Sequence, residues 1–256
     1  MNRNTKPKID IEHLTFTYTD NVTALKDVTL QIQPNELFVL FGPSRGGKST
    51  LLRVLNRLSD LIEGTQRQGV VRFNGQDIFA PTVDVTDLRR RLSMVFATPT
   101  PLPGSIMDNL TYGLRMAGIR DTRVLEERVT QALKQAAIWD EVKDRLDSSA
   151  FALSGGQKQR VCLARSLALE PDVILLDNPT SGLDPLSTAA VEESLLELKE
   201  RYTIIMVPHS VQQAARVADR AAFLMGGEVI EVGPRRQIFV NPKDRRTEDY
   251  VVGRFG

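Results

Sequence analysis

Hydrophobic and polar residues alternate along the first part of the chain. Between residues 9 and 41 the alternation is that of β-strands, and Asp20-Asn21 and Gln33-Pro34-Asn35 supply turn residues between them. Residues 69–79 read as a hairpin, because an Asn-Gly pair favours the tight turn that joins two antiparallel strands. The pattern therefore predicts that the first part of the chain consists mainly of β-strands.

A proline-rich loop marks the change from strands to helices. Residues 85–91 are predicted to form a short basic helix that leads into a strand at 92–96. Residues 98–104 then contain three prolines, which can continue neither a helix nor a sheet. Beyond them an apolar set with helical spacing follows the candidate helix cap Asp121-Thr122: Val124, Leu125, Val129 and Leu133. Residues 98–160 are therefore predicted to form an inserted helical lobe.

A glycine-rich loop lies between a predicted buried strand at 37–41 and a helical run at 51–55. It reads Gly42-Pro43-Ser44-Arg45-Gly46-Gly47-Lys48-Ser49-Thr50 and fits the P-loop pattern G-x-x-x-x-G-K-[ST]. Backbone N–H groups in such a loop attract polyphosphate; Lys48 would reach the β/γ-phosphates, and Ser49 would offer its hydroxyl to Mg²⁺. The alternative is a glycine-rich turn without a ligand, but strand, loop, lysine-serine pair and helix are all present. The loop predicts that the chain binds a nucleoside triphosphate.

The alternation of strands and helices resumes after residue 160. Two strongly apolar segments, 173–177 and 203–207, are separated by a helical stretch at 188–200, which implies a parallel sheet. We therefore expect a single α/β domain over residues 1–256. Its P-loop core, together with the strands of the first part, would comprise residues 1–97 and 161–256, and the helical lobe residues 98–160.

Composition limits the partners that the chain can have. The 33 basic and 32 acidic residues give a net charge of +1, which excludes a strong attraction to nucleic acid or anionic lipid. The lone cysteine, Cys162, excludes an internal disulfide and fits a reducing compartment. No apolar signal-peptide core follows the basic N-terminus, and no apolar run approaches the ~20 residues needed to span a bilayer. We expect a cytoplasmic chain whose membrane role, if any, comes through a partner.

A second glycine pair occurs in the segment Leu153-Ser154-Gly155-Gly156-Gln157, ahead of a helical run at 161–169. Taken alone, Ser-Gly-Gly is a common turn. Three further groups follow it in order: Asp177 at the end of a strand, Ser181-Gly182-Leu183-Asp184, and His209 after the next strand. An acid at the end of such a strand can hold Mg²⁺ through water. A lone histidine after a strand is usually structural, but this one is the last member of the series of motifs just described.

These motifs in this order resemble the ATP-binding subunits of ABC transporters. The resemblance implies an α/β fold with a P-loop NTPase core, an antiparallel β lobe and an inserted helical lobe. It also implies a head-to-tail homodimer, in which the P-loop of one copy and residues 154–157 of the other hold each ATP. Further segments are similar to the phosphate-import branch of the family: residues 55–62, 137–146, 212–217 and 247–256. The chain would then be the ATPase that energises phosphate import.

The resemblance also implies roles for single residues and for partners. Tyr18, which by its pattern alone is a half-buried strand residue, would stack on adenine, and residues 42–50 would hold the phosphates. Asp177 would orient Mg²⁺, and His209 would touch the γ-phosphate. Ser154, Gly155, Gly156 and Gln157 would reach the ATP of the partner copy, and Asp184 would lie at the dimer seam. The dimer would dock on transmembrane permease subunits at the cytoplasmic face of a bacterial membrane, and phosphate would pass through the permease without touching this chain.

Three residues depart from the family pattern at the expected active site. Asn178 stands where the family has the glutamate that acts as a base or orients water, and Ala97 stands where it has a glutamine that contacts Mg²⁺ and water. Arg45 replaces a P-loop glycine, which would cost about 1–2 kcal/mol if the position needs a positive φ.

The departures leave two hypotheses open. The chain is the working ATPase of a phosphate importer, or it is an ATP-dependent dimerising switch that hydrolyses ATP poorly. A third class, a soluble ABC protein of repair or translation, predicts tandem cassettes or a long coiled-coil insertion, and the sequence contains neither.

Overall fold

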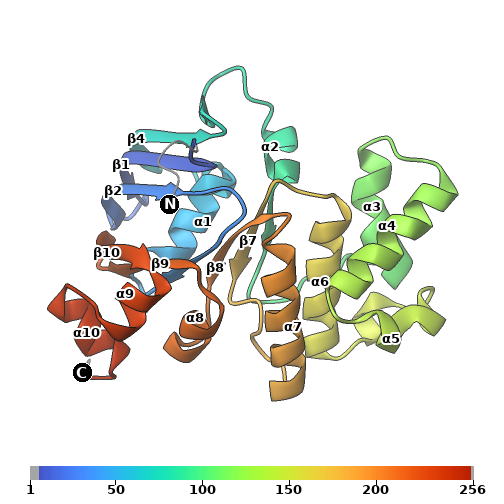
Figure 1. Cartoon of the computed structure of the whole chain (residues 1–256). Helices are drawn as coiled ribbons and strands as arrows, with labels where there is room; N and C mark the ends of the chain where they lie inside the picture. Colours follow the sequence, from blue (N-terminus) through green and yellow to red (C-terminus); the bar gives the residue numbers. More distant parts are fainter. Residues whose placement is uncertain (1–5, 255–256) are drawn as a thin grey trace.

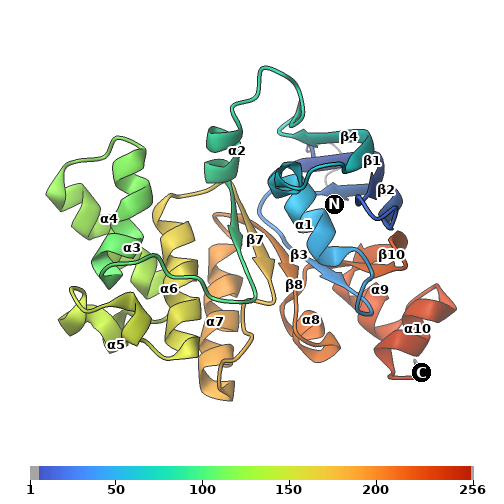
Figure 2. The same ribbon diagram turned by 180° about the vertical axis from the view of Figure 1, so that it is seen from behind.

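The computed structural model describes residues 6–254. Residues 1–5 of the basic N-terminal segment and residues 255–256 of the C-terminal segment therefore lie outside the described residues. Within that range the chain forms two sheets and a group of helices (Figure 1). The β lobe, drawn in blue to teal, lies at one side of the molecule and the helical lobe, drawn in green to yellow, at the other. Strands β7 (Val173–Asp177) and β8 (Thr203–Val207) lie between them (Figures 1 and 2).

The first sheet is the predicted antiparallel β lobe, with strand order β2-β1-β4-β5. Its strands are β1 (Ile9–Thr17), β2 (Thr23–Ile32), β4 (Gln66–Phe73) and β5 (Gln76–Asp77). The tight turn between β4 and β5 is the predicted one, since Asn74 and Gly75 have φ of 52° and 82° and both therefore adopt the left-handed conformation that this turn requires. The predicted strands and hairpin are confirmed.

The second sheet is six-stranded, with the order β10-β9-β3-β8-β7-β6. The strands are β3 (Leu37–Phe41), β6 (Leu92–Val95), β7 (Val173–Asp177), β8 (Thr203–Val207), β9 (Arg220–Met225) and β10 (Glu228–Pro234). The pairs β9-β3, β3-β8, β8-β7 and β7-β6 are parallel, as predicted, and β10 is an antiparallel edge strand.

Alternate residues of β3 belong to two different cores. Phe38 and Leu40 pack with the β lobe and with helix α1 (Lys48–Leu55). Leu37, Val39 and Phe41 pack with the helices on the opposite face of the sheet. Successive side chains of a strand point to opposite faces, so a strand covered on both faces must be apolar throughout. This explains the unbroken hydrophobic run that precedes the P-loop.

The helices flank the parallel sheet or form the helical lobe. Those of the core are α1 (Lys48–Leu55), α2 (Val85–Arg91), α7 (Pro185–Leu198), α8 (Val211–Val217), α9 (Arg235–Val240) and α10 (Arg245–Val251). Those after the proline-rich loop are α3 (Ile106–Met116), α4 (Thr122–Gln135), α5 (Trp139–Val142) and α6 (Gly155–Ala168). Short 3-10 helices are η1 (Leu58–Leu61), η2 (Lys143–Arg145) and η3 (Ala150–Ala152). Asp121 caps α4 as predicted, accepting from the N–H groups of Arg123 and Val124.

Helix α6 starts earlier than the sequence pattern predicts. It begins at Gly155 instead of Val161, because Ser154 and Gln157 form a capping box that starts the helix at the glycine pair. Since α6 packs against α3 and α4 as well as against β6, it joins the helical lobe to the core. A division of the chain at residues 160/161 would cut this helix, and the assignment of 98–160 as a separate lobe stays a proposal.

No helix within residues 6–254 is both long and apolar enough to cross a membrane.

Candidate functional site

The predicted phosphate-binding loop is a tight turn between β3 and α1. Helix α1 begins at Lys48, and Gly47 precedes it in the left-handed conformation with φ 94°. The neighbouring strand β9 lies so close that a Cβ atom would be 2.0 Å from the carbonyl oxygen of Leu224 at Gly42, and 2.8 Å from it at Gly46. Glycine is therefore required at both positions, because a side chain there would collide with the backbone of β9.

The side chain of Lys48 folds back onto the loop. Its Nζ donates to the carbonyl oxygens of Gly42, at 2.8 Å, and Pro43, at 2.7 Å. Burial lowers the pKa of Lys48, and the carboxylate of Asp177 opposes that shift. The loop thus holds a partly desolvated ammonium group against two neutral carbonyl oxygens, which leaves it open to a stronger, anionic partner.

Ser49, in the helix after β3, meets Asp177, the last residue of β7, although these two strands are not neighbours in the sheet. The Ser49 hydroxyl donates to Oδ1 of Asp177 at 3.0 Å, and Asp177 is buried. In the described part of the chain, no three His, Cys, Asp or Glu side chains gather closely enough to hold a metal ion by themselves. One hydroxyl beside one carboxylate does fit Mg²⁺, which usually takes one or two protein oxygens and completes its shell with water and substrate phosphates.

One cavity of about 210 Å³ joins five of the predicted site residues: Gly42 and Ser44 of the P-loop line it together with Lys48, Asn178 and His209. They follow β3, β7 and β8, whose carboxyl ends lie at the same edge of the sheet, the usual place for a ligand in such a fold. Asn178 has φ 49°, a conformation that asparagine tolerates better than most residues. The remaining lining residues are Phe41, Val207, Pro208, Ser210, Val211 and Tyr250.

Tyr18 lies one residue beyond β1 and is half-buried. Its hydroxyl forms a 3.0 Å hydrogen bond with the hydroxyl of Thr50, in the first turn of α1, and its ring meets Phe16 edge-on. The tyrosine is therefore attached to the helix that the P-loop starts. This placement is compatible with contact to a base, and also with the structural role that the strand pattern suggested.

The segment 154–157 is well built but does not line the cavity of the P-loop. Gln157 N–H donates to the Ser154 hydroxyl at 3.3 Å, and Ser154 N–H donates back to the Gln157 side chain at 3.1 Å. The Gln157 amide also donates to Glu141 at 2.9 Å, which ties the start of α6 to α5. A Cβ atom at Gly155 would meet nothing within 4 Å. The structure thus presents this segment on an open surface, apart from the other site residues of the same chain.

Two of the departures from the family pattern have visible local consequences. Arg45 has φ 61° and is exposed, so the P-loop holds a non-glycine residue in the left-handed conformation considered above. Ala97 follows β6 and brings no polar side chain, but the carbonyl of its neighbour Phe96 accepts a 2.8 Å hydrogen bond from Gln159 on α6. The loop at position 97 is therefore anchored to α6 through its backbone.

Two buried amides at the site have roles that the sequence analysis did not predict. Gln159 is the anchor just described, and Gln213 contacts the backbone N–H of His209 at 2.9 Å. For Gln213 the sequence offers one signal, its position: a glutamine four residues after His209, at the start of a helix, can turn back towards the histidine.

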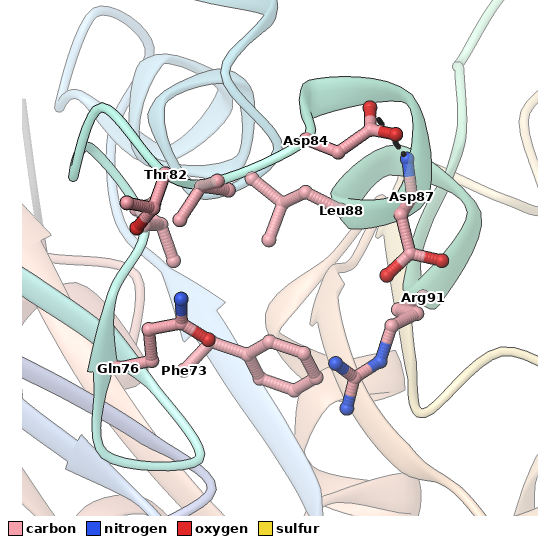
Figure 3. Close-up of a pocket in the computed structure, with 9 residues that line it drawn as sticks. Phe73, Gln76, Thr82, Asp84, Asp87, Leu88 and Arg91 are labelled. Carbon is pink, nitrogen blue, oxygen red and sulfur yellow. Dashed lines mark hydrogen bonds between the residues drawn. The ribbon is translucent and has the colours of Figure 1, made fainter.

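A separate cavity of about 450 Å³ lies between the β lobe and α2 and contains none of the predicted site residues (Figure 3). Its charged groups already have partners. Arg91 lies over the ring of Phe73 at 4.6 Å and donates to Asp172 at 2.8 Å, and Lys8 donates to the same carboxylate at 2.6 Å. Asp84 caps α2. These contacts hold α2 against the two sheets.

Comparison with known proteins agrees with the family resemblance of the motifs. A sequence model described as ABC transporter matches residues 25–181. The chain is 54% identical over 233 residues to the phosphate import ATP-binding protein PstB 2 of Lactiplantibacillus plantarum, covering 91% of this chain and 93% of that protein. It is 48% identical over 252 residues to phosphate import ATP-binding protein PstB 1 of Streptococcus agalactiae, covering 98% and 100%.

Solved structures agree on the fold. The cbiO1 protein of Clostridium perfringens, part of the ABC transporter complex cbiONQ, superposes with a TM-score of 0.80 at 26% identity, covering 97% of this chain and 96% of that one. The ATP-binding cassette MJ0796, a dimer in a post-hydrolysis state bound to ADP and Pi, superposes with a TM-score of 0.78 at 28% identity, covering 89% and 99%. With a family model that matches most of its length and relatives that share about half of its residues, the chain belongs to the ABC transporter family.

Proposed function

We propose that this chain binds ATP with Mg²⁺ at the P-loop and hydrolyses it as the energising subunit of a phosphate importer. The observation that carries the proposal is the cavity shared by Lys48, Asn178 and His209, with the Ser49–Asp177 pair beside the same loop. This arrangement assembles a phosphate-binding cation, a pair of oxygen ligands and two groups able to contact water or phosphate. The phosphate-import names of the relatives support the transported anion.

The P-loop residues 42–50 hold the phosphates of ATP. Lys48 gives up its two carbonyl contacts for charged phosphate oxygens, which are stronger partners for an ammonium. Ser49 and Asp177 would hold Mg²⁺, which would supply positive charge beside the phosphates. Tyr18 lies against α1 and offers its ring to the base.

His209 and Asn178 act on the γ-phosphate and the attacking water. His209 is exposed at the cavity, so its imidazole can contact a phosphate oxygen. Asn178 can orient water by hydrogen bonding, but its amide cannot take a proton. A general base contributes about 10²–10⁴-fold, so its loss raises the barrier by about 3–5 kcal/mol. The second candidate function, an ATP-binding switch with slow turnover, rests on Asn178 and Ala97.

A second copy of the chain completes each site. Residues 154–157 do not line the cavity of their own P-loop, yet they form an exposed helix start with open space at Gly155. A helix N-terminus of this kind attracts phosphate. A head-to-tail homodimer brings the segment to the partner's ATP and places Asp184 at the seam. The dimeric state of a cassette with a similar fold supports dimerisation.

The dimer docks on transmembrane permease subunits as a peripheral protein at the cytoplasmic face of the membrane. The relatives' names support an import complex, and the near-zero net charge gives no reason to expect a nucleic-acid partner. Phosphate itself crosses through the permease and does not contact this chain.

The test measures nucleotide binding and turnover in one set of proteins. Lys48→Ala should abolish detectable MgATP binding in calorimetry and stop phosphate release by the complete transporter. The matched control is Lys143→Ala, which removes an exposed lysine of the helical lobe that pairs with Asp140. ATP affinity unchanged in Lys48→Ala would refute the nucleotide site. Normal binding with negligible turnover of the unaltered chain in the complete transporter would favour the switch.

A further inference from the structure

A buried polar network lies behind the cavity and links His209 to the loop that ends at Asp184. Gln213, on α8, is its centre and is only 2% exposed. Its side-chain oxygen accepts from the backbone N–H of His209 at 2.9 Å. Its amide nitrogen donates to the Thr180 hydroxyl at 2.9 Å and to Oε1 of Glu192 on α7 at 3.0 Å.

The orientation of this amide is determined by its partners. An ionised carboxylate can only accept hydrogen bonds, so the NH₂ group of Gln213 must face Glu192 and its oxygen must face His209. Glu192 is held in the ionised form by Arg216, which donates to both of its oxygens at 2.7 and 2.8 Å; these hydrogen bonds lower the pKa of Glu192. The acceptor and both donors of the Gln213 amide therefore each have a partner.

The network reaches the part of the chain that would face a second copy. Thr180 is 7% exposed and stands in the loop between Asn178 and Asp184. Its carbonyl accepts from the N–H of Leu183, so the residue is held both by its side chain and by its backbone. Because an unpaired polar group is costly in a buried place, Thr180 cannot move far without drawing Gln213 with it.

We infer that Gln213 is a positioning residue for hydrolysis, which sets the backbone of His209 according to the position of the loop from Thr180 to Asp184. The inference rests on the proposed function, in which His209 contacts the γ-phosphate and that loop meets the partner copy. Gln213 does not touch ATP. Its effect is to make the placement of the histidine depend on the dimer seam.

The experiment is single-turnover cleavage of labelled ATP by the full chain, with ATP affinity measured in parallel. Gln213→Met keeps the length of the side chain and removes its hydrogen bonds, and it should slow cleavage at least about tenfold while ATP affinity changes less than about twofold. In a His209→Ala background the same change should have almost no further effect, because two residues that act through one step are non-additive. An equal slowing in both backgrounds would overturn the inference.

An exchange of the two polar groups tests the connection itself. Gln213→Glu alone places two carboxylates side by side and should slow cleavage. Combined with Glu192→Gln it restores one carboxylate, which accepts from the N–H of His209, and one amide, whose oxygen accepts from Nε of Arg216. Because Nη2 of Arg216 loses its acceptor, the pair should recover part of the cleavage rate that Gln213→Glu alone removes. Failure of the exchange to recover any of that rate, in a protein that binds ATP normally, would overturn the inference.

Gln237→Met is the matched control, since Gln237 also donates to a glutamate, Glu231, at 3.0 Å but lies on α9 outside the cavity. It should leave cleavage unchanged. The fluorescence of Trp139, the single tryptophan, verifies that each variant is folded. If His209→Ala cleaves ATP as fast as the unaltered chain, the proposed role of His209 fails. If His209→Ala is slow but Gln213→Met is not, only the positioning role fails.

Discussion

Restoring the two family residues of the active site should raise turnover and lower stability together. Asn178 lines the cavity beside Lys48 and His209, so Asn178→Glu places a carboxylate near the attacking water. A general base is worth about 10²–10⁴-fold, or about 3–5 kcal/mol of barrier. Position 178 has φ 49°, however, and a glutamate there loses the tolerance that asparagine has for this conformation, at a cost of about 1–2 kcal/mol in folding stability.

Ala97→Gln and Asn178→Glu should act on the same step of hydrolysis. Ala97→Gln returns an amide to the loop whose backbone Gln159 anchors at Phe96, but without a base at 178 the amide alone has little to assist. The two substitutions together should therefore accelerate hydrolysis more than the product of their separate effects. ATP affinity should stay roughly unchanged, because neither residue belongs to the P-loop.

The assay is phosphate release at saturating MgATP, with thermal unfolding measured on the same proteins. His209→Ala in the double revertant is the control and should remove most of the gain. If the unaltered chain already turns over as fast as the double revertant, the reasoning that Asn178 and Ala97 slow hydrolysis is wrong, and another group, with His209 as first candidate, orients the water. If Asn178→Glu leaves the melting temperature unchanged, the strain assigned to position 178 is absent.

Three further predictions concern binding, assembly and stability. Gly46→Ala should weaken ATP binding and lower the melting temperature, because its Cβ would lie 2.8 Å from the backbone oxygen of Leu224; calorimetry with normal affinity would contradict this. Ser154→Arg should abolish MgATP-dependent dimers in size-exclusion chromatography with light scattering, and dimers that persist would argue against the head-to-tail assembly. Burial by itself raises the pKa of Asp172, but the hydrogen bonds from its two cationic partners leave it lowered, so its contribution to stability is present above about pH 4 and is lost as the pH falls further. Asp172→Asn should then be less stable than the unaltered chain in urea at pH 7 and closer to it at pH 3, and a constant difference would contradict the shift.

The sequence by itself was enough to predict those parts of the site whose residues all lie in one short segment. The P-loop is one continuous segment between a strand and a helix, and its lysine, serine and glycines follow from that segment alone. The Asn74-Gly75 turn and the Asp121 cap are likewise decided by neighbouring residues, and the structure confirms both. The start of α6 was predicted wrongly, although its signal was also local, because a capping box outweighed the low helix propensity of two glycines.

Only the tertiary structure decided which residues meet across the chain. The order β3-β8-β7 places Lys48, Asn178 and His209 around one cavity, and strand order depends on packing between segments far apart in the sequence. The need for glycine at position 46 comes from the backbone of β9, and the function of Gln213 comes from partners on three different segments. The spacing in the sequence hints at the contact of Gln213 with His209, but not at its contacts with Thr180 and Glu192, because a side chain acquires distant partners from the fold and only its chemical capacity from the sequence.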